Sequence, residues 1–368
     1  MEKVCVFCGE RPESKSKEHV IPLWLIERTG DPRRIARFGV DFYRDPPAFR
    51  EFSFDSLTFP ACTQCNNDFS KLEENAKSVM IRLLDREPLS QTDLSFLLDW
   101  LDKVRVGLWL GYLYLDRNPQ GIRPQYYIST RIGQTDRAVA IIRIAGRRFG
   151  INFIGPESPC FQGNPTCFAL LINEFCFINA AGVSLCSQRL GFPYAQPTHL
   201  RDDSKLEVVF KAGTARIMRP VQRGWSIANA VLLHQPIFRN WIVMEGVKSI
   251  FDTDWVKAHS LQWENGYGGI FLEKSDSVRE YPDAEALDWL PSRDWHLPDV
   301  LRYTVPFVYG RLIRDLKEGA EISGRERRKQ MLQSMAAFKR IHEAMLRPLR
   351  HQSRRAGAER SSAAQKQD

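Results

Sequence analysis

The sequence predicts an α+β protein with three parts: a small cysteine-bearing N-terminal module, a larger mixed α/β domain, and a basic C-terminal helix and tail. Three observations support this prediction. Two C-x-x-C pairs lie within the first 65 residues, short β-branched and aromatic runs fill the middle of the chain, and positive charge gathers at its end. The 368 residues suffice for two or three domains, and 43% hydrophobic and 26% charged residues make an ordinary globular balance.

The domain boundaries follow from these changes in pattern. Apolar residues at helical spacing between Leu94 and Leu108 predict a helix over 91–116, which we expect to act as a spacer. A second helical pattern covers 72–85. We therefore expect a module at 1–85, a connecting helix at 86–117, a mixed α/β domain at 118–320, a basic helix at 321–346 and a disordered basic tail at 347–368.

The region after the connecting helix is rich in strand-like runs, which are bounded by Gly, Pro, Asn and Asp. One helix is expected within it, at 225–234. This domain would recognise a target, a protein partner or a small ligand. The expected strands are 125–130, 138–145, 149–155, 167–172, 175–181, 206–210 and 214–218.

The net charge of +8 belongs to the C-terminal segment. Between Arg325 and Asp368 there are 12 Lys and Arg residues and four acidic residues, so the preceding 324 residues are neutral overall. A basic arm of this kind can bind nucleic acid through its phosphates without reading sequence. The alternative is a solvated helix with a frayed end.

The sequence shows no signal for secretion or for membrane insertion. The N-terminus lacks a basic start followed by an apolar run, and the longest charge-free stretch, 158–173, is shorter than a span of about 18 residues. We therefore expect a cytoplasmic protein with no membrane partner. Eight cysteines in that compartment argue against a disulfide framework.

Four of the cysteines form two knuckles, Cys5 with Cys8 and Cys62 with Cys65, separated by 53 residues. Each C-x-x-C can place two thiolates on one cation through a tight turn, and Gly9 supplies the permissive backbone. Two such pairs complete the tetrahedral four-thiolate geometry of structural zinc. The residues between the knuckles are poor in apolar periodicity, so we expect the module to need zinc to fold. A closed four-thiolate site has no open position for catalysis.

A second group of polar residues flanks these knuckles. Glu18 and His19 begin the run E-H-V-I-P, and Asn66 directly follows the second knuckle. An imidazole titrates near neutral pH, so His19 suits a general base that takes a proton from water. The side-chain oxygens of Glu18 and Asn66 suit a hard cation such as Mg²⁺. A base and a cation near the scissile phosphate are what phosphodiester hydrolysis requires.

The pattern C-x-x-C…E-H-V-I-P…C-x-x-C-N over residues 1–75 resembles the HNH endonuclease family in its four-cysteine zinc form, the ββα-metal nucleases. The resemblance implies a β-hairpin bearing Glu18 and His19, packed on a helix that starts near Asn66. It implies His19 as the general base, and Glu18 and Asn66 as ligands of a catalytic Mg²⁺ or Mn²⁺. It also implies the four knuckle cysteines as zinc ligands.

The sequence departs from the family pattern in two places. Aspartate is the commoner residue before the base, so the longer Glu18 would contact the metal directly or through water. The family's middle asparagine, which orients the base, has no counterpart, because Ser56 stands where Asn often does. Either Ser56 or Asp55 would substitute for it. Asn67, Asp68 and Glu73 are further candidate ligands.

These observations predict a metal-dependent HNH endonuclease acting on DNA, with RNA as an open alternative. Fusions of such a module to a recognition domain resemble bacterial defence nucleases, an analogy of architecture. Two rivals stay open. The knuckles could form a zinc ribbon in a non-catalytic nucleic-acid or protein adaptor, or the nuclease could be silent until a partner engages the central domain.

Overall fold

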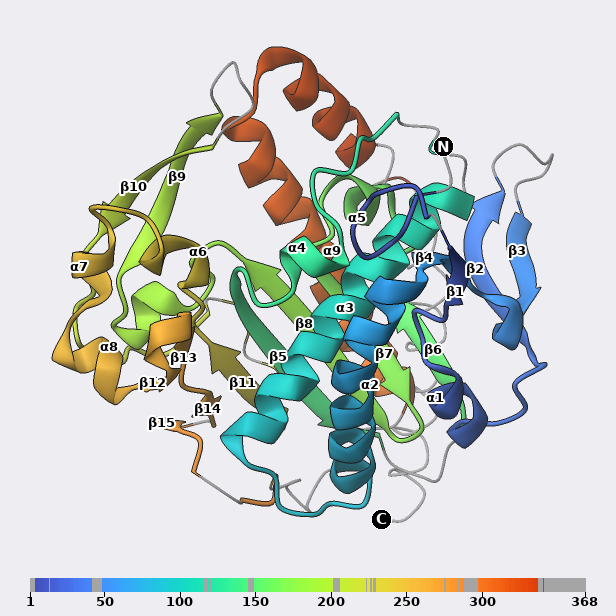
Figure 1. Ribbon diagram of the computed structural model, residues 1–368, viewed down its shortest axis with the longest axis horizontal. Coiled ribbons are helices and arrows are strands. Elements are labelled where there is room, and N and C mark those ends of the chain that lie inside the picture. Colours follow the sequence, from blue (N-terminus) through green and yellow to red (C-terminus); the bar gives the residue numbers. More distant parts are fainter. Residues whose placement is uncertain are drawn as a thin grey trace, which may run out of the picture.

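One long helix, α3 (Gln91–Leu115), lies between the N-terminal module and a seven-stranded sheet (Figure 1). The computed structural model confirms the predicted mixture of helices and strands. It describes residues 4–12, 14–41, 48–115, 118, 121–144, 149–200, 206–222, 224–225, 227, 230–274, 276–282, 285–287, 297–336 and 340.

The N-terminal module contains two antiparallel strands followed directly by a helix. Strand β1 (Lys15–Glu18) pairs with β4 (Phe59–Cys62), and α2 (Thr63–Leu84) begins at the next residue and packs on both strands. The segment between the strands holds α1 (Leu23–Arg28), β2 (Ile35–Asp41), β3 (Ala48–Ser53) and the 3-10 turn η1 (Phe54–Ser56).

Helix α2 confirms the apolar pattern predicted at 72–85 but begins earlier. Its buried residues Ala76, Val79, Met80 and Leu83 recur every three or four positions, as one face of a helix requires. Its first turns carry no such stripe, because there the helix packs on strands rather than on a broad apolar surface.

The central sheet is antiparallel throughout and has the strand order β15-β14-β11-β5-β8-β7-β6. Four of the predicted strands appear in it as β5 to β8. Its strands are β5 (Asp136–Arg143), β6 (Ile151–Ile154), β7 (Cys167–Ile172), β8 (Phe175–Gly182), β11 (Val231–Gln235), β14 (Phe271–Glu273) and β15 (Val278–Glu280).

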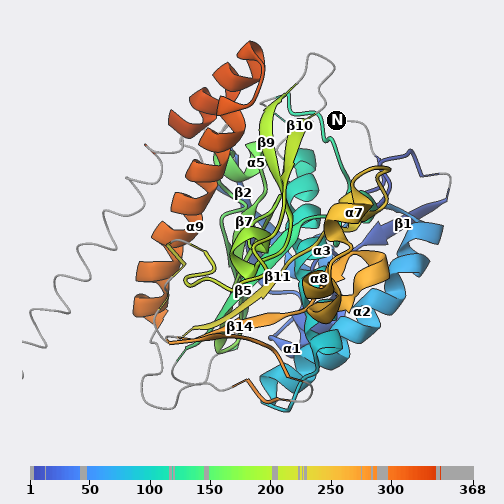
Figure 2. The same cartoon turned by 90° about the vertical axis from the view of Figure 1, so that its left-hand side faces the viewer.

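Helices cover both faces of this sheet (Figure 2). Helix α9 (Leu297–Glu321) contacts β7 and β8, whereas α3 contacts β5 and β8 from the other side. The short helix α5 (Pro159–Gly163) touches both α3 and α9. Every residue of α3 from Trp100 to Leu113 is buried. The helix expected as a spacer is therefore a central element of the core.

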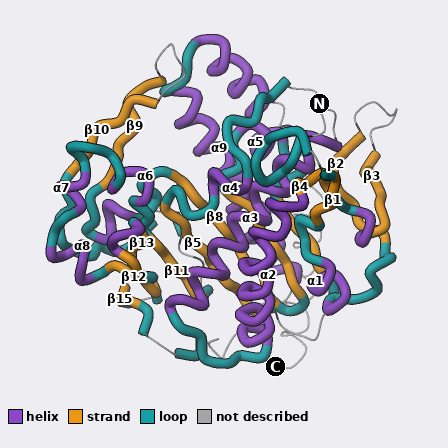
Figure 3. The backbone as a smooth tube through the Cα atoms, viewed as in Figure 1, coloured by secondary structure: helices purple, strands orange, loops and turns teal. Residues whose placement is uncertain are grey.

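A smaller group of elements lies to one side of the sheet (Figure 3). It has its own apolar cluster around Phe192, Phe238, Phe251 and Phe271. The elements are η2 (Ser187–Leu190), β9 (Tyr194–Leu200), β10 (Leu206–Lys211), α6 (Arg239–Ile242), α7 (Lys248–Phe251), α8 (Asp254–Ala258), β12 (Ser260–Gln262), η3 (Trp263–Asn265) and β13 (Tyr267–Gly268).

The structure corrects three of the predicted elements. The helix expected at 225–234 is wrong, because 231–235 form strand β11, buried between β5 and β14; short buried runs of either kind look alike in sequence. The strand expected at 125–130 is wrong, because Ile128–Arg131 form the turn of helix α4. No strand forms at the described residues 214–218.

The C-terminal region also differs in its boundaries. Helix α9 ends at Glu321, and a further helix covers 325–336, so the basic helix begins four residues later than the sequence predicts. The predicted tail at 347–368 lies outside the described residues. Among the described helices, none combines the length and apolar character that crossing a bilayer would require.

Candidate functional site

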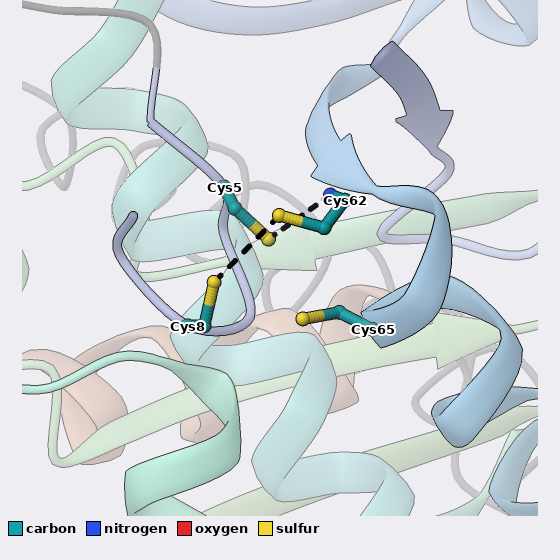
Figure 4. Close-up of side chains that lie close together, drawn as sticks. All are labelled: Cys5, Cys8, Cys62 and Cys65. Carbon is teal, nitrogen blue, oxygen red and sulfur yellow. Dashed lines mark hydrogen bonds between the residues drawn. The ribbon is translucent and has the colours of Figure 1, made fainter. Parts of the chain in front are cut away.

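Four cysteine side chains converge where the N-terminal loop meets the start of α2 (Figure 4). Cys5 and Cys8 come from the loop, Cys62 ends β4, and Cys65 lies in the first turn of α2. Their sulfur atoms all lie within 4.8 Å of one another, so they could hold one zinc ion, as the spacing predicts. Among the described residues, no other group of three or more His, Cys, Asp or Glu side chains is so arranged.

Backbone hydrogen bonds shape the first knuckle around Cys5. The amide of Gly9 donates to the carbonyl oxygen of Cys5 at 2.9 Å, and Gly9 has a φ of +84°, which a side chain would disfavour. The amide of Cys62 donates to Cys5 Sγ at 3.2 Å and so joins the two knuckles. Burial and the neighbouring thiols Cys5 and Cys8 raise the pKa of Cys62, so four thiolates at this spacing need a cation to neutralise them.

His19 lies directly after β1 and is held by a backbone group. Its Nε2 donates to the carbonyl oxygen of Asp55 at 2.8 Å, because a carbonyl can only accept. In the neutral imidazole this leaves the lone pair on Nδ1, for which the described residues provide no hydrogen-bond donor. The His19 side chain is half-buried and lies directly after strand β1.

The segment that contains Asp55 and Ser56 contacts His19 through its main chain. The side chain of Ser56 donates to the carbonyl oxygen of Ser53 at 2.6 Å, and the carboxylate of Asp55 accepts from the hydroxyl of Ser53. Both side chains therefore stabilise the turn η1. This turn places the carbonyl oxygen of Asp55 within hydrogen-bond distance of His19.

Glu18 faces inward and pairs with a residue of α3 that lies outside the predicted site. Lys103 Nζ, on α3, donates to Glu18 Oε1 at 2.5 Å and also to Glu73 Oε1 on α2. Burial raises the pKa of Glu18, an effect that Lys103 opposes. Burial also works against the charge on Lys103, but Glu73 and Glu18 together raise its pKa, so the lysine stays protonated.

Asn66 lies on the face of α2 that contacts β1. Its Nδ2 is 3.5 Å from the hydroxyl oxygen of Ser16, and Ser16 shares a face of β1 with Glu18 because side chains alternate along a strand. The structure thus brings Asn66 and Glu18 to one face of the strand pair. His19 follows at the end of that strand.

Lys103 is the site residue that sequence reasoning missed, although a signal was present. Charged residues interrupt the otherwise apolar run of α3, and buried charges require partners. Besides Lys103, the charged residues Asp99 and Asp102 of α3 also have a partner, because both lie within ion-pair distance of Arg137 on β5. The partner of Lys103 could not be read from the sequence, because Glu18 lies 85 positions away.

Comparisons with protein-family models, with curated proteins and with solved structures gave no match.

Proposed function

We propose that residues 1–85 are the catalytic module of a metal-dependent HNH-type endonuclease that hydrolyses phosphodiester bonds in DNA. The observation that carries the proposal is the placement of His19. It follows β1 of a strand–strand–helix unit joined by four cysteines, and the Asp55 carbonyl fixes its ring with Nδ1 free to accept a proton. This is the chemistry that activating a water molecule requires.

The proposed catalytic cation would be held by Glu18 and Asn66. Glu18 Oε1 is engaged by Lys103, so Oε2 is the oxygen available to a metal, and Asn66 adds an amide oxygen from the same face. Such hard oxygen donors fit Mg²⁺ or Mn²⁺, and water and substrate phosphate would complete the coordination. A cation there would neutralise charge on the scissile phosphate. The zinc proposed at the cysteines would hold β4 and α2 against the N-terminal loop.

A basic surface supports nucleic acid as the substrate. Arg325, Arg328 and Lys329 are exposed on the helix at 325–336, where they can contact phosphates without reading sequence. Recognition of a target or partner by residues 118–320, and a role in bacterial defence, stay predictions.

The test compares the wild-type protein with His19→Ala in a plasmid-cleavage assay over a series of Mg²⁺, Mn²⁺ and Ni²⁺ concentrations, with single-stranded RNA as a second substrate. We expect His19→Ala to lower the cleavage rate at least about 100-fold, because general-base catalysis contributes roughly 10²–10⁴-fold. Zinc content and the circular dichroism spectrum should not change. His259→Ala, a histidine outside the module, is the matched control and should cleave like the wild type. Undiminished cleavage by His19→Ala would overturn the assignment.

A non-catalytic zinc-ribbon adaptor is the second candidate function. The observation that favours it is the pairing of Glu18 with Lys103, which takes one carboxylate oxygen away from a metal. An adaptor predicts DNA or protein binding that is equally tight with and without Mg²⁺ or Mn²⁺, and no nicking of plasmid. A nuclease silenced in the free protein instead predicts cleavage once its partner is added.

A further inference from the structure

Lys103 joins three elements of the candidate site through one buried ammonium group. Its side chain is 0% exposed. It contacts Glu18 at the end of β1 and Glu73 on α2, and its Nζ lies 5.8 Å from the ring centre of Phe7 in the first knuckle. Phe7 stacks on Phe69 of α2 with ring centres 4.6 Å apart. Lys103, which belongs to α3, therefore contacts β1, α2 and the first knuckle of the N-terminal module.

The backbone of α3 fixes where this ammonium lies. Gly107 and Gly111 follow Lys103 at four-residue intervals, so all three lie on one face of the helix. A Cβ atom at Gly107 would meet Val20 at 2.7 Å, and one at Gly111 would meet the ring of Phe59 at 2.3 Å. Both glycines allow α3 to approach the module closely. The ammonium position is thus set by packing over two turns of helix.

The charges of this cluster do not balance. Two carboxylates share one ammonium, which leaves a formal charge of −1. Glu73 Oε2 is buried and has no hydrogen-bond partner among the described residues. A buried ion pair gives little net stability compared with apolar packing, so stability alone does not explain the group. Without the lysine, two carboxylates would lie close together as a ready pair of oxygen ligands for a divalent cation.

We infer that Lys103 is a positioning residue whose ammonium group takes the place of a metal ion between Glu18 and Glu73; we call this the tethered-cation role. Because the ammonium binds Oε1 of Glu18, Oε2 of Glu18 stays available to a metal ion near His19. This inference rests on the proposed function. The lysine keeps a divalent cation out of the position between Glu18 and Glu73, which its ammonium group occupies. It also fixes the rotamer of the residue that directly precedes His19.

The test is Lys103→Met, which keeps the length of the side chain but removes the charge. We expect opposite changes in two measurements. Mn²⁺ should bind about tenfold or more tightly, because a repelling charge is gone and two carboxylates are free to chelate. The kcat for plasmid cleavage should fall about 10–100-fold with KM for DNA unchanged, as for loss of a group that orients a metal ligand.

A readout without catalysis makes the inference independent of the nuclease assay. On zinc-loaded protein, Mn²⁺ should raise the Tm of Lys103→Met more than that of the wild type, because a ligand that binds the folded state stabilises it. Lys103→Arg keeps the positive charge and should therefore bind Mn²⁺ no more tightly than the wild type. Lys77→Met, at an exposed position on α2, is the matched charge control and should change none of the three measurements.

The possible results test the role of Lys103 and the proposed nuclease function separately. If Mn²⁺ binds Lys103→Met no more tightly than wild type, or if kcat is unchanged, the tethered-cation role is wrong. If the wild type never cleaves, the proposed nuclease function fails while the Mn²⁺-dependent Tm shift still tests Lys103. Should Lys103→Met not fold, the Lys103→Met, Glu73→Gln double variant restores the net charge of the cluster. The double variant should bind Mn²⁺ about as the wild type does and cleave about 10–100-fold more slowly than the wild type. Cleavage at the wild-type rate would overturn the inference.

Discussion

At the scale of single residues, the ring of His19 is held by a backbone atom rather than by another side chain. The Asp55 carbonyl accepts from His19 Nε2 at 2.8 Å, so the turn η1 selects the tautomer. Any sequence that forms this turn can present the same carbonyl. Ser56, which stands in the place of the family's asparagine, points to Ser53 instead. If His19 is the base that we propose, the Asp55 carbonyl supplies the group that orients it, and the Ser56 side chain is not needed for that.

This geometry predicts that Ser56→Ala cleaves nearly as well as the wild type. Ser56 is exposed and contributes one hydrogen bond to its own turn, so we expect a change of no more than about 0.5 kcal/mol, or roughly twofold in rate. The measurement is the initial rate of plasmid nicking in Mg²⁺. A loss as large as that of His19→Ala would show that the Ser56 side chain orients the base.

At the scale of elements, α3 does more than connect two parts of the chain. One face packs on the module through Lys103, Gly107 and Gly111, and another carries Asp99 and Asp102 towards Arg137 of the sheet. An amphipathic stripe correctly predicts such a helix but underestimates its burial. A helix apolar all round belongs in the centre of a core. Its few charges are then all involved in specific pairs.

The close approach of α3 to β4 predicts opposite effects for two glycine substitutions. Gly111→Ala should destabilise the protein by about 1–3 kcal/mol, because its Cβ would lie 2.3 Å from the Phe59 ring. The control is Gly310→Ala in α9, where a Cβ would meet no atom of the described residues within 4 Å. That change should stabilise by about 0.5–1 kcal/mol through helix propensity.

Urea unfolding followed by circular dichroism measures both free energies of unfolding. Equal effects of the two substitutions would mean that α3 and β4 are not in this contact.

At the scale of the whole molecule, the cysteine cluster and the sheet belong to one structure. Buried apolar residues from Cys5 to Met331 form a single continuous cluster that includes the module, α3, the sheet and α9. The boundary expected near residue 85 therefore separates two sequence patterns rather than two cores. Small metal-bound modules often unfold without their metal, and here the rest of the protein shares that core.

This continuity predicts one cooperative thermal transition that moves as a whole when zinc is removed. A chelator should lower the Tm of the entire protein, because loss of the cysteine site loosens the face of α3 that packs on β4. Differential scanning calorimetry measures the transition, and a chelator already saturated with zinc is the control. Two separate transitions, with only the smaller one sensitive to the chelator, would contradict a shared core.

Features that depend on neighbours along the chain could be predicted from the amino-acid sequence. The spacing within each C-x-x-C predicts a pair of thiolates, the four runs at β5 to β8 predict strands, and the period of α2 and α3 predicts helices. Each of these follows from backbone geometry over a few residues. Where two conformations share one local pattern, as in the buried strand β11, the sequence favoured the wrong one.

Contacts between residues far apart in the chain, by contrast, follow from the three-dimensional fold. The carbonyl that holds His19 is a backbone atom 36 positions away, and the lysine that holds Glu18 is 85 positions away. Neither contact can be predicted from a periodic pattern in the sequence. Every residue type has a main-chain carbonyl, so the acceptor for His19 does not depend on residue type. A buried charge can pair with any opposite charge that the fold brings near. Burial then sets the energetic value of such a contact. An ion pair of Lys103 would contribute little in water, but its loss is costly where the side chain is 0% exposed, because an unpaired buried charge is unfavourable.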